Sequence, residues 1–210
     1  MRRFFHDNGL TIVLLLLFAA SLIGQLLSGW HYQVAELALH GEPPISLLAY
    51  SSDPQFLAMV AENWESEFLQ MAAYVVLTAY LFQRGSSESR DPDGGDARPG
   101  DEPRFTRGRL GWLYAHSLGL ALFALFLIAF GVHLVASSAA TNDEAALHGE
   151  AAVGLIDHLV SARFWFESFQ NWQSEFFSTA VLIVLSIYLR QQRSPESKAV
   201  GDPDAKTGAD

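Results

Sequence analysis

Long apolar stretches without charged residues alternate with polar stretches along the chain. Residues 10–27 and 110–135 contain no Asp, Glu, Lys or Arg, and each can cross a hydrocarbon core of about 30 Å as a helix. Two shorter uncharged stretches, 68–83 and 176–189, become long enough when the tryptophan that precedes each one is counted as an interfacial anchor. The pattern therefore predicts an all-α membrane protein with four transmembrane helices.

The second half of the chain repeats the first at an offset of 108 residues. NWESEF at 63–68 returns as NWQSEF at 171–176, and ELALHGE matches EAALHGE at six of seven positions. Residues 63–89 match 171–197 at fourteen of twenty-seven positions, which indicates an internal duplication. Each repeat holds two spans, so both copies enter the membrane in the same direction. This predicts tandem parallel two-helix repeats, related by a pseudo-twofold axis along the membrane normal.

The predicted organisation follows from these two patterns. Repeat one covers 1–84, with spans at about 9–29 and 64–83 and an external loop at 30–63. Repeat two covers 109–193, with spans at about 110–136 and 172–190 and an external loop at 137–171. A linker at 85–108 joins the repeats, and a tail covers 194–210. The linker and the tail are rich in Gly, Pro, Ser and charge, and we expect both to be disordered.

The distribution of basic residues predicts the orientation. Twelve of the thirteen Lys and Arg residues lie in 2–3, 84–109 and 190–206. Because positive residues stay on the cytoplasmic side, we expect a multi-pass protein of the cell membrane with both termini inside. The first apolar stretch also fits a signal peptide. We expect a retained anchor, since the stretch exceeds the usual h-region of about 7 to 15 residues and its counterpart is the third span.

Composition excludes several kinds of chemistry. The chain has no cysteine, which rules out disulfides, thiolate metal sites and cysteine nucleophiles. The formal net charge of -10 lies mostly in loops and tails, and the scattered basic residues do not predict nucleic-acid binding. No nucleophile elbow, phosphate-binding loop or HExxH motif occurs, so we do not expect an enzyme.

The first external loop contains a helix start. Ser52 or Asp53 can cap the helix, with Pro54 as its first residue. No Gly or Pro follows until the cytoplasmic side, so one helix can run from the external surface through the second span.

The duplicated motif groups polar side chains where a helix enters the membrane. Asn63 and Glu67 are four residues apart and share a face with Trp64. Asn171, Trp172 and Glu175 repeat this arrangement. One interpretation is a cation or proton site at Glu67 and Glu175.

Further ligands for such a site lie in the external loops. His40 and Glu42, with His148 and Glu150, add imidazole and carboxylate donors for a divalent metal. The alternative is that Trp64 and Trp172 anchor the helices at the interface while the carboxylates pair locally. We favour this alternative, because His-Gly-Glu lacks the spacing of known metal motifs. The cofactor prediction is therefore none, with a divalent metal or haem left open.

Polar side chains also occur inside the predicted spans. Gln25 and His133 occupy equivalent positions of the two repeats, and His116 lies earlier in the third span. They could line a path between the copies, or His116 and His133 could ligate haem. The simpler interpretation is interhelical hydrogen bonding.

The duplicated NWxSEF motif, HGEPP in the first loop, and the span exits QRGSSES and QQRSPES together resemble a family of bacterial integral membrane proteins classed as a domain of unknown function. The resemblance implies a bacterial cell membrane and no particular activity. We expect a non-enzymatic protein in the lipid bilayer whose external loops bind a protein partner or a second copy. The alternatives are a small cation or proton transporter or channel that uses Glu67 and Glu175, and a metal- or haem-binding membrane protein.

Overall fold

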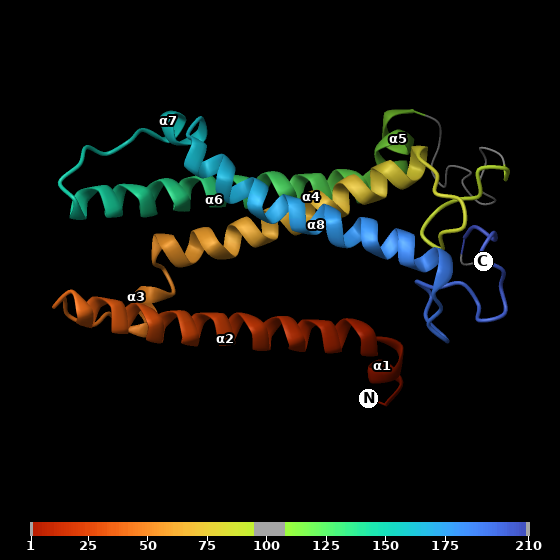
Figure 1. Ribbon diagram of the computed structural model, residues 1–210, viewed down its shortest axis with the longest axis horizontal. Coiled ribbons are helices and arrows are strands. Elements are labelled where there is room, and N and C mark those ends of the chain that lie inside the picture. Colours follow the sequence, from red (N-terminus) through yellow and green to blue (C-terminus); the bar gives the residue numbers. More distant parts are fainter. Residues whose placement is uncertain (1, 95–107, 209–210) are drawn as a thin grey trace.

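The computed structural model describes residues 2–94 and 108–208, and the regular structure in this part of the chain is entirely helical. The protein is all-α, with four long helices (Figure 1). Short helices accompany them: α1 (Arg2–Asp7), α3 (Leu47–Tyr50), α5 (Arg109–Ala115) and α7 (Leu155–Leu159).

The long helices form two pairs of equal length. α2 (Gly9–Leu39) and α6 (Ser117–Leu147) each contain 31 residues, and α4 (Pro54–Tyr80) and α8 (Ala162–Tyr188) each contain 27. The start of α6 lies 117 − 9 = 108 residues after that of α2, and the start of α8 lies 162 − 54 = 108 after that of α4. The order of elements is therefore the same in both halves of the chain.

Side-chain caps fix where α4 and α8 begin. Asp53 accepts a hydrogen bond from the backbone N–H of Gln55, and Pro54 is the first helical residue, which confirms the predicted helix start. Ser161 caps α8 in the same manner by accepting from the N–H of Phe164. Each helix thus starts 14 residues before the uncharged stretch that forms its second half (68 − 54 and 176 − 162).

Helices α4 and α6 pack along each other, and α8 crosses α4 (Figure 1). Buried side chains lie mainly between these three helices, among them Phe56, Ala61, Phe126 and Phe164. α2 lies apart from them, with backbone contacts mainly to α1 and α3. It touches α4 through the rings of Phe18 and Trp64, whose centroids are 6.1 Å apart. The core is therefore built from three of the four long helices.

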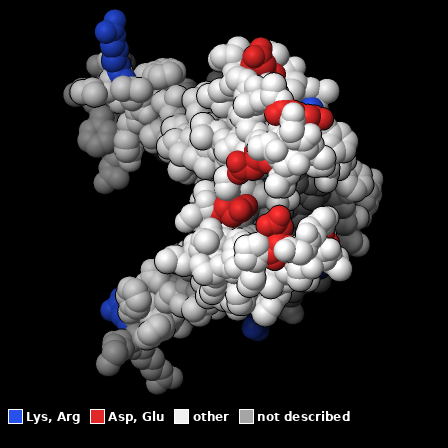
Figure 2. Space-filling view, turned by 90° about the vertical axis from the view of Figure 1, so that its left-hand side faces the viewer, with Lys and Arg blue, Asp and Glu red and all other residues white. Residues whose placement is uncertain are grey.

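Two of the long helices, α2 and α6, are long and apolar enough to cross a membrane. The other two, α4 and α8, are less apolar because each carries charged residues in its first half. Helix α1 and the turns that follow α8 lie at one end of the molecule (Figure 1). Figure 2 looks onto the opposite end, where carboxylates are spread over the surface.

Turns follow α8 and lie beside the end of α4. Lys198 is buried, and its Nζ donates to the backbone carbonyls of Gly85, Asp204 and Lys206. Residues 95–107 of the linker lie outside the described residues, and the predicted disorder of linker and tail stays a prediction.

Candidate metal centre

A fully buried histidine on α6 is the centre of a polar cluster in the core. His133 and Glu65 of α4 are both 0% exposed, and His133 Nδ1 lies 2.7 Å from Glu65 Oε2. The other oxygen of Glu65 accepts a hydrogen bond of 2.8 Å from Trp172 Nε1. A carboxylate can only accept, so Nδ1 of His133 carries a proton. Nε2 lies on the other side of the ring and is directed away from Glu65.

His133 Nε2 points at two further carboxylates without a hydrogen bond to either. It lies 3.6 Å from Glu62 Oε2 on α4 and 3.6 Å from Glu167 Oε2 on α8, beyond hydrogen-bond length. It is buried and has no hydrogen-bond partner among the described residues. A buried polar atom without a partner is costly and calls for an explanation.

Each of the two carboxylates is oriented by other side chains. Glu62 Oε1 accepts from Asn171 Nδ2 at 3.0 Å. Glu167 Oε2 accepts from Ser137 Oγ at 2.6 Å, and Glu167 Oε1 accepts from Arg163 Nε at 3.2 Å. Hydrogen bonds of this kind hold ligands in place around metal ions.

The surroundings move the pKa values of these two carboxyls in opposite directions. Burial raises the pKa of Glu62, and the hydrogen bond from Asn171 and the nearby His133 offset this only in part. Burial also acts to raise the pKa of Glu167, but His133, Ser137 and Arg163 outweigh it and lower the pKa to about 2. Glu167 is therefore the firmly ionised member of the pair.

A hydrogen-bond chain leads from Glu167 toward the external loop. Ser137 has one hydroxyl proton, which it donates to Glu167, so His158 Nε2 must be the donor in its 3.0 Å contact with Ser137 Oγ. His158 is itself buried, and burial lowers its pKa. A neutral His158 with its proton on Nε2 satisfies this chain.

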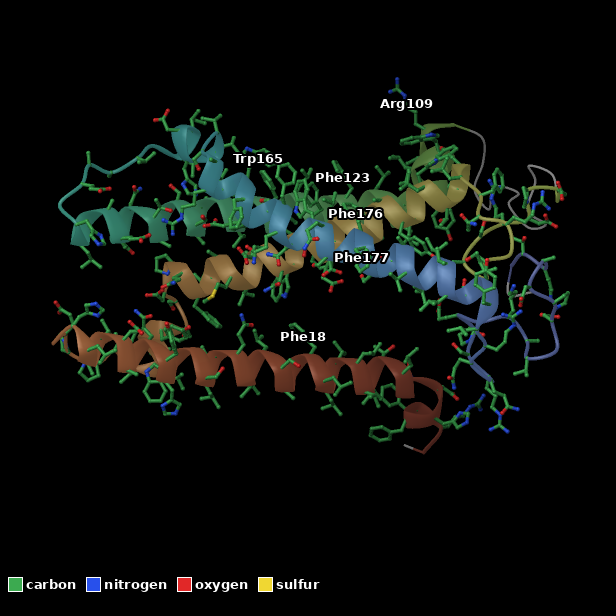
Figure 3. All side chains as sticks on the ribbon, viewed as in Figure 1. Phe18, Arg109, Phe123, Trp165, Phe176 and Phe177 are labelled. Atoms are coloured by element: carbon green, nitrogen blue, oxygen red, sulfur yellow. The ribbon has the colours of Figure 1, made fainter. Side chains whose placement is uncertain are left out.

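Aromatic rings exclude water from one side of the cluster. Phe164 is 0% exposed, and its centroid lies 4.9 Å from that of His133. Trp165 of α8 lies beside α6 (Figure 3), with its ring 6.1 Å from Trp172 and 6.4 Å from Phe130. Electrostatic attraction between a cation and the carboxylates is stronger in such a place than in water.

The donor set fits a divalent first-row transition metal. The ligand atoms of Glu62, His133 and Glu167 all lie within 4.8 Å of one another. Tetrahedral ligands about 2.0 to 2.1 Å from zinc are separated by about 3.3 to 3.4 Å, close to the 3.6 Å from Nε2 to each carboxylate. Imidazole with carboxylates suits zinc, manganese or iron(II). Three protein ligands would leave at least one position for water or another ligand.

The two copies of the NWxSEF motif have different surroundings. Asn171 and Trp172 bind Glu62 and Glu65, so they orient the cluster. Asn63 bonds the backbone of its own helix at Met59, and Trp64 is exposed beside Phe18.

The predicted metal candidates lie outside the cluster. The rings of His40 and His148 bond the carbonyls of Glu36 and Glu144 on their own helices, and three more candidates are exposed: Glu42, Glu67 and Glu150. Glu175 is half-buried and close enough for its charge to act on Glu67.

Of the predicted intramembrane polar residues, only His133 belongs to the centre. Gln25 is half-buried on α2, and His116 is exposed with its ring bonded to the carbonyl of Trp112. His116 and His133 are 133 − 116 = 17 residues apart in the chain, about 26 Å along a helix. In one chain they cannot ligate the same haem iron.

Sequence reasoning missed the three carboxylates of the cluster. Glu62 and Glu65 are three residues apart on one helix, a spacing that brings two carboxylates to the same face. Glu167 has no comparable signal, because only the crossing of α8 over α4 brings it to His133.

These observations define the class of the protein: it is a helical protein with two helices long and apolar enough to cross a membrane, and one of them, α6, carries the histidine of the polar cluster. Residues 1–209 match the model of the family described as Domain of unknown function (DUF6766), and the chain belongs to that family. No curated protein matches the chain. No solved structure matches it either.

Proposed function

We propose that this is an integral membrane protein that binds a divalent transition-metal ion through Glu62, His133 and Glu167. The unpartnered, buried Nε2 of His133 is the observation that carries the proposal. A metal ion would give this nitrogen a partner and would offset the charge of the carboxylates around it. Glu65 and Trp172 would then act as a second layer that fixes the ring of His133.

The proposed membrane arrangement is four spans in two tandem hairpins with both termini in the cytoplasm. The apolar character of α2 and α6 and the equal helix bounds in the two halves support it. In this arrangement Glu62 and Glu167 lie at the external boundary, where carboxylates cost less than at the membrane centre. The metal would reach the site from the external side.

Zinc titration of the purified, EDTA-treated protein tests the metal proposal. The wild type is expected to bind one zinc ion per chain, and His133→Gln to bind at least about 100-fold more weakly because a ligand is lost. His148→Gln is the matched control and should bind as the wild type does, since that ring bonds its own helix. A wild type that binds no zinc, or equal binding by His133→Gln, would overturn the proposal.

Cysteine labelling tests the membrane arrangement, because the chain has no cysteine of its own. Ser52 and Ala205 are both exposed, one before α4 and one in the C-terminal turns. A membrane-impermeant maleimide added to intact cells should label Ser52→Cys and not Ala205→Cys. Equal labelling of both variants, or the reverse pattern, would contradict the orientation.

Partner binding by the external loops stays a prediction. Cation transport through Glu67 and Glu175 stays the alternative. The proposed metal site is compatible with both partner binding and cation transport, and a divalent metal ion is the ligand to test.

A further inference from the structure

Two apolar faces of this chain lack the partner that their counterparts have. On α6, Leu122 is 8% exposed and Phe126 is 9% exposed. The residues 108 positions earlier on α2, Leu14 and Phe18, are 55% and 47% exposed. Helix α2 therefore carries the same apolar face as α6 but leaves about half of the surface of these two side chains exposed.

The same difference separates α8 from α4. Ala72 on α4 is 5% exposed, while Ala180, its counterpart on α8, is exposed. Around Ala180 lies a shallow apolar depression lined by Phe177, Ala180, Val181, Val184 and Leu185. Figure 3 labels Phe177 on α8 and Phe18 on α2.

The packing of α4 on α6 shows what covers such a face. A Cβ on Gly119 of α6 would lie 3.4 Å from Val76 Cγ2 of α4, so the two helices are in van der Waals contact there. The counterparts of these two positions are Thr11 on α2 and Val184 on α8. We propose that α2 of one copy packs on α8 of a second copy, in the manner in which α6 packs on α4 within one chain.

A second copy fits better than the chain's own α2. Within the chain, α2 is held beside α3 and α4: Trp30 Nε1 donates to the carbonyl of Ile45, and the ring of Phe18 lies 6.1 Å from that of Trp64, centroid to centroid. To reach its own α8, α2 would have to leave these positions. A second copy needs no rearrangement, because each chain presents the α2 face and the α8 face at once.

Both faces are also the right kind of surface for this contact. They are apolar, and their counterparts already form a close helix pair, so complementary shape is expected. Since the two faces differ, each copy offers one of each, and two copies can exchange contacts and close as a dimer. The inference rests on the tandem repeat and does not use the metal centre.

Pairwise disulfide formation tests the proposed interface in a chain free of cysteine. Two differently tagged chains, one with Thr11→Cys and one with Val184→Cys, are co-expressed and oxidised in native membranes. The expected result is a disulfide-linked heterodimer, because these positions should lie within disulfide reach across the interface. Leu182→Cys in place of Val184→Cys is the matched control: it is exposed on another side of α8 and should not link.

A single chain with Gly119→Cys and Val76→Cys reports the reference contact and should form a disulfide within the chain. A single chain with both Thr11→Cys and Val184→Cys separates the remaining outcomes. Linkage only within the chain would show that α2 covers its own α8 and would overturn the proposal. No linkage would overturn it as well, since lipid would then cover these faces. Equal linkage with Leu182→Cys would also overturn it, since random collision would then explain the disulfides.

Discussion

The two halves of the molecule have the same helical plan and different chemistry. Four positions form the cluster around the proposed metal, and each has a neutral counterpart 108 residues away: Gln170 for Glu62, Gln173 for Glu65, Gln25 for His133, and Met59 for Glu167. The cluster takes Glu62 and Glu65 from the first half and His133 and Glu167 from the second, and the counterpart positions offer no carboxylate or imidazole. The scaffold is duplicated, while the chemistry is confined to one place in it.

A second pair of counterparts, Ser137 and Gly29, makes a different contact in each half of the chain. Ser137 on α6 bonds His158 of α7 at 3.0 Å. At the equivalent place, a Cβ on Gly29 of α2 would lie 2.3 Å from the hydroxyl of Tyr50 on α3. The larger Tyr50 thus requires glycine opposite, and a packing contact stands where the other half has a hydrogen bond.

The largest expected effect comes from making Glu62 like its counterpart. Glu62→Gln removes a charged ligand, and zinc affinity should fall by about 100-fold or more, measured by competition with a chelating dye. Gln170→Glu, the reverse change at the counterpart position on α8, is the matched control and should leave zinc affinity unchanged. Equal zinc affinity of Glu62→Gln and the wild type would show that Glu62 is not a ligand.

Glu65→Gln should have the next largest effect. The amide can present its oxygen to His133 or to Trp172, but its NH₂ group then faces the N–H of the other. Zinc affinity should fall by about 10- to 100-fold with one zinc ion still bound at saturation. An unchanged affinity would show that Glu65 does not position His133.

Gly29→Ala tests the compensating contact in the other half. The added Cβ would meet the Tyr50 hydroxyl at 2.3 Å, and the free energy of unfolding should fall by about 1 to 3 kcal/mol. Gly24→Ala has no atom within 4 Å of the added Cβ and should be neutral or stabilising, because alanine favours helix. Both variants are compared by denaturation in the same detergent, and equal stability would contradict the assigned contact.

The smallest expected effects concern pH in the metal-free protein. The pKa of Glu167 is lowered to about 2 on folding, so its ionised form stabilises the fold above pH about 4.5, and this contribution is lost as pH falls toward 2. The pKa of Glu62 is raised, so its ionised form destabilises the fold at neutral pH, and stability is recovered as pH falls through the raised pKa.

Opposite signs are therefore expected from the two neutral variants. At pH 7, without metal, Glu167→Gln should lower the melting temperature and Glu62→Gln should raise it. Both differences from the wild type should shrink as pH is lowered. Shifts of the same sign in both variants would contradict the assigned environments.

The sequence was informative where local pattern determines structure. The start of α4 follows from Asp53 and Pro54 alone, and the apolar character of α2 and α6 is visible as two long uncharged stretches. The same pattern singled out His133, because a polar residue in an apolar helix is unusual.

The candidate metal centre was predictable only in part because its residues are brought together by tertiary contacts. The duplicated NWxSEF motif drew attention to Glu67 and Glu175, although their neighbours Asn171 and Trp172 are the members that bind the cluster. Glu62 and Glu65 stand at positions where the repeats differ, and a search for shared residues passes over them. Positions at which the two repeats differ were therefore a better guide to the polar cluster than positions at which they match.

X-ray absorption at the zinc edge of the protein loaded with one zinc ion per chain tests the central claim most directly. The account predicts one imidazole nitrogen at about 2.0 to 2.1 Å, with the remaining ligands oxygen. The imidazole signal should disappear in His133→Gln. Two or more imidazoles around zinc, or a single one that persists in His133→Gln, would show that other histidines hold the metal and would contradict the site formed by Glu62, His133 and Glu167.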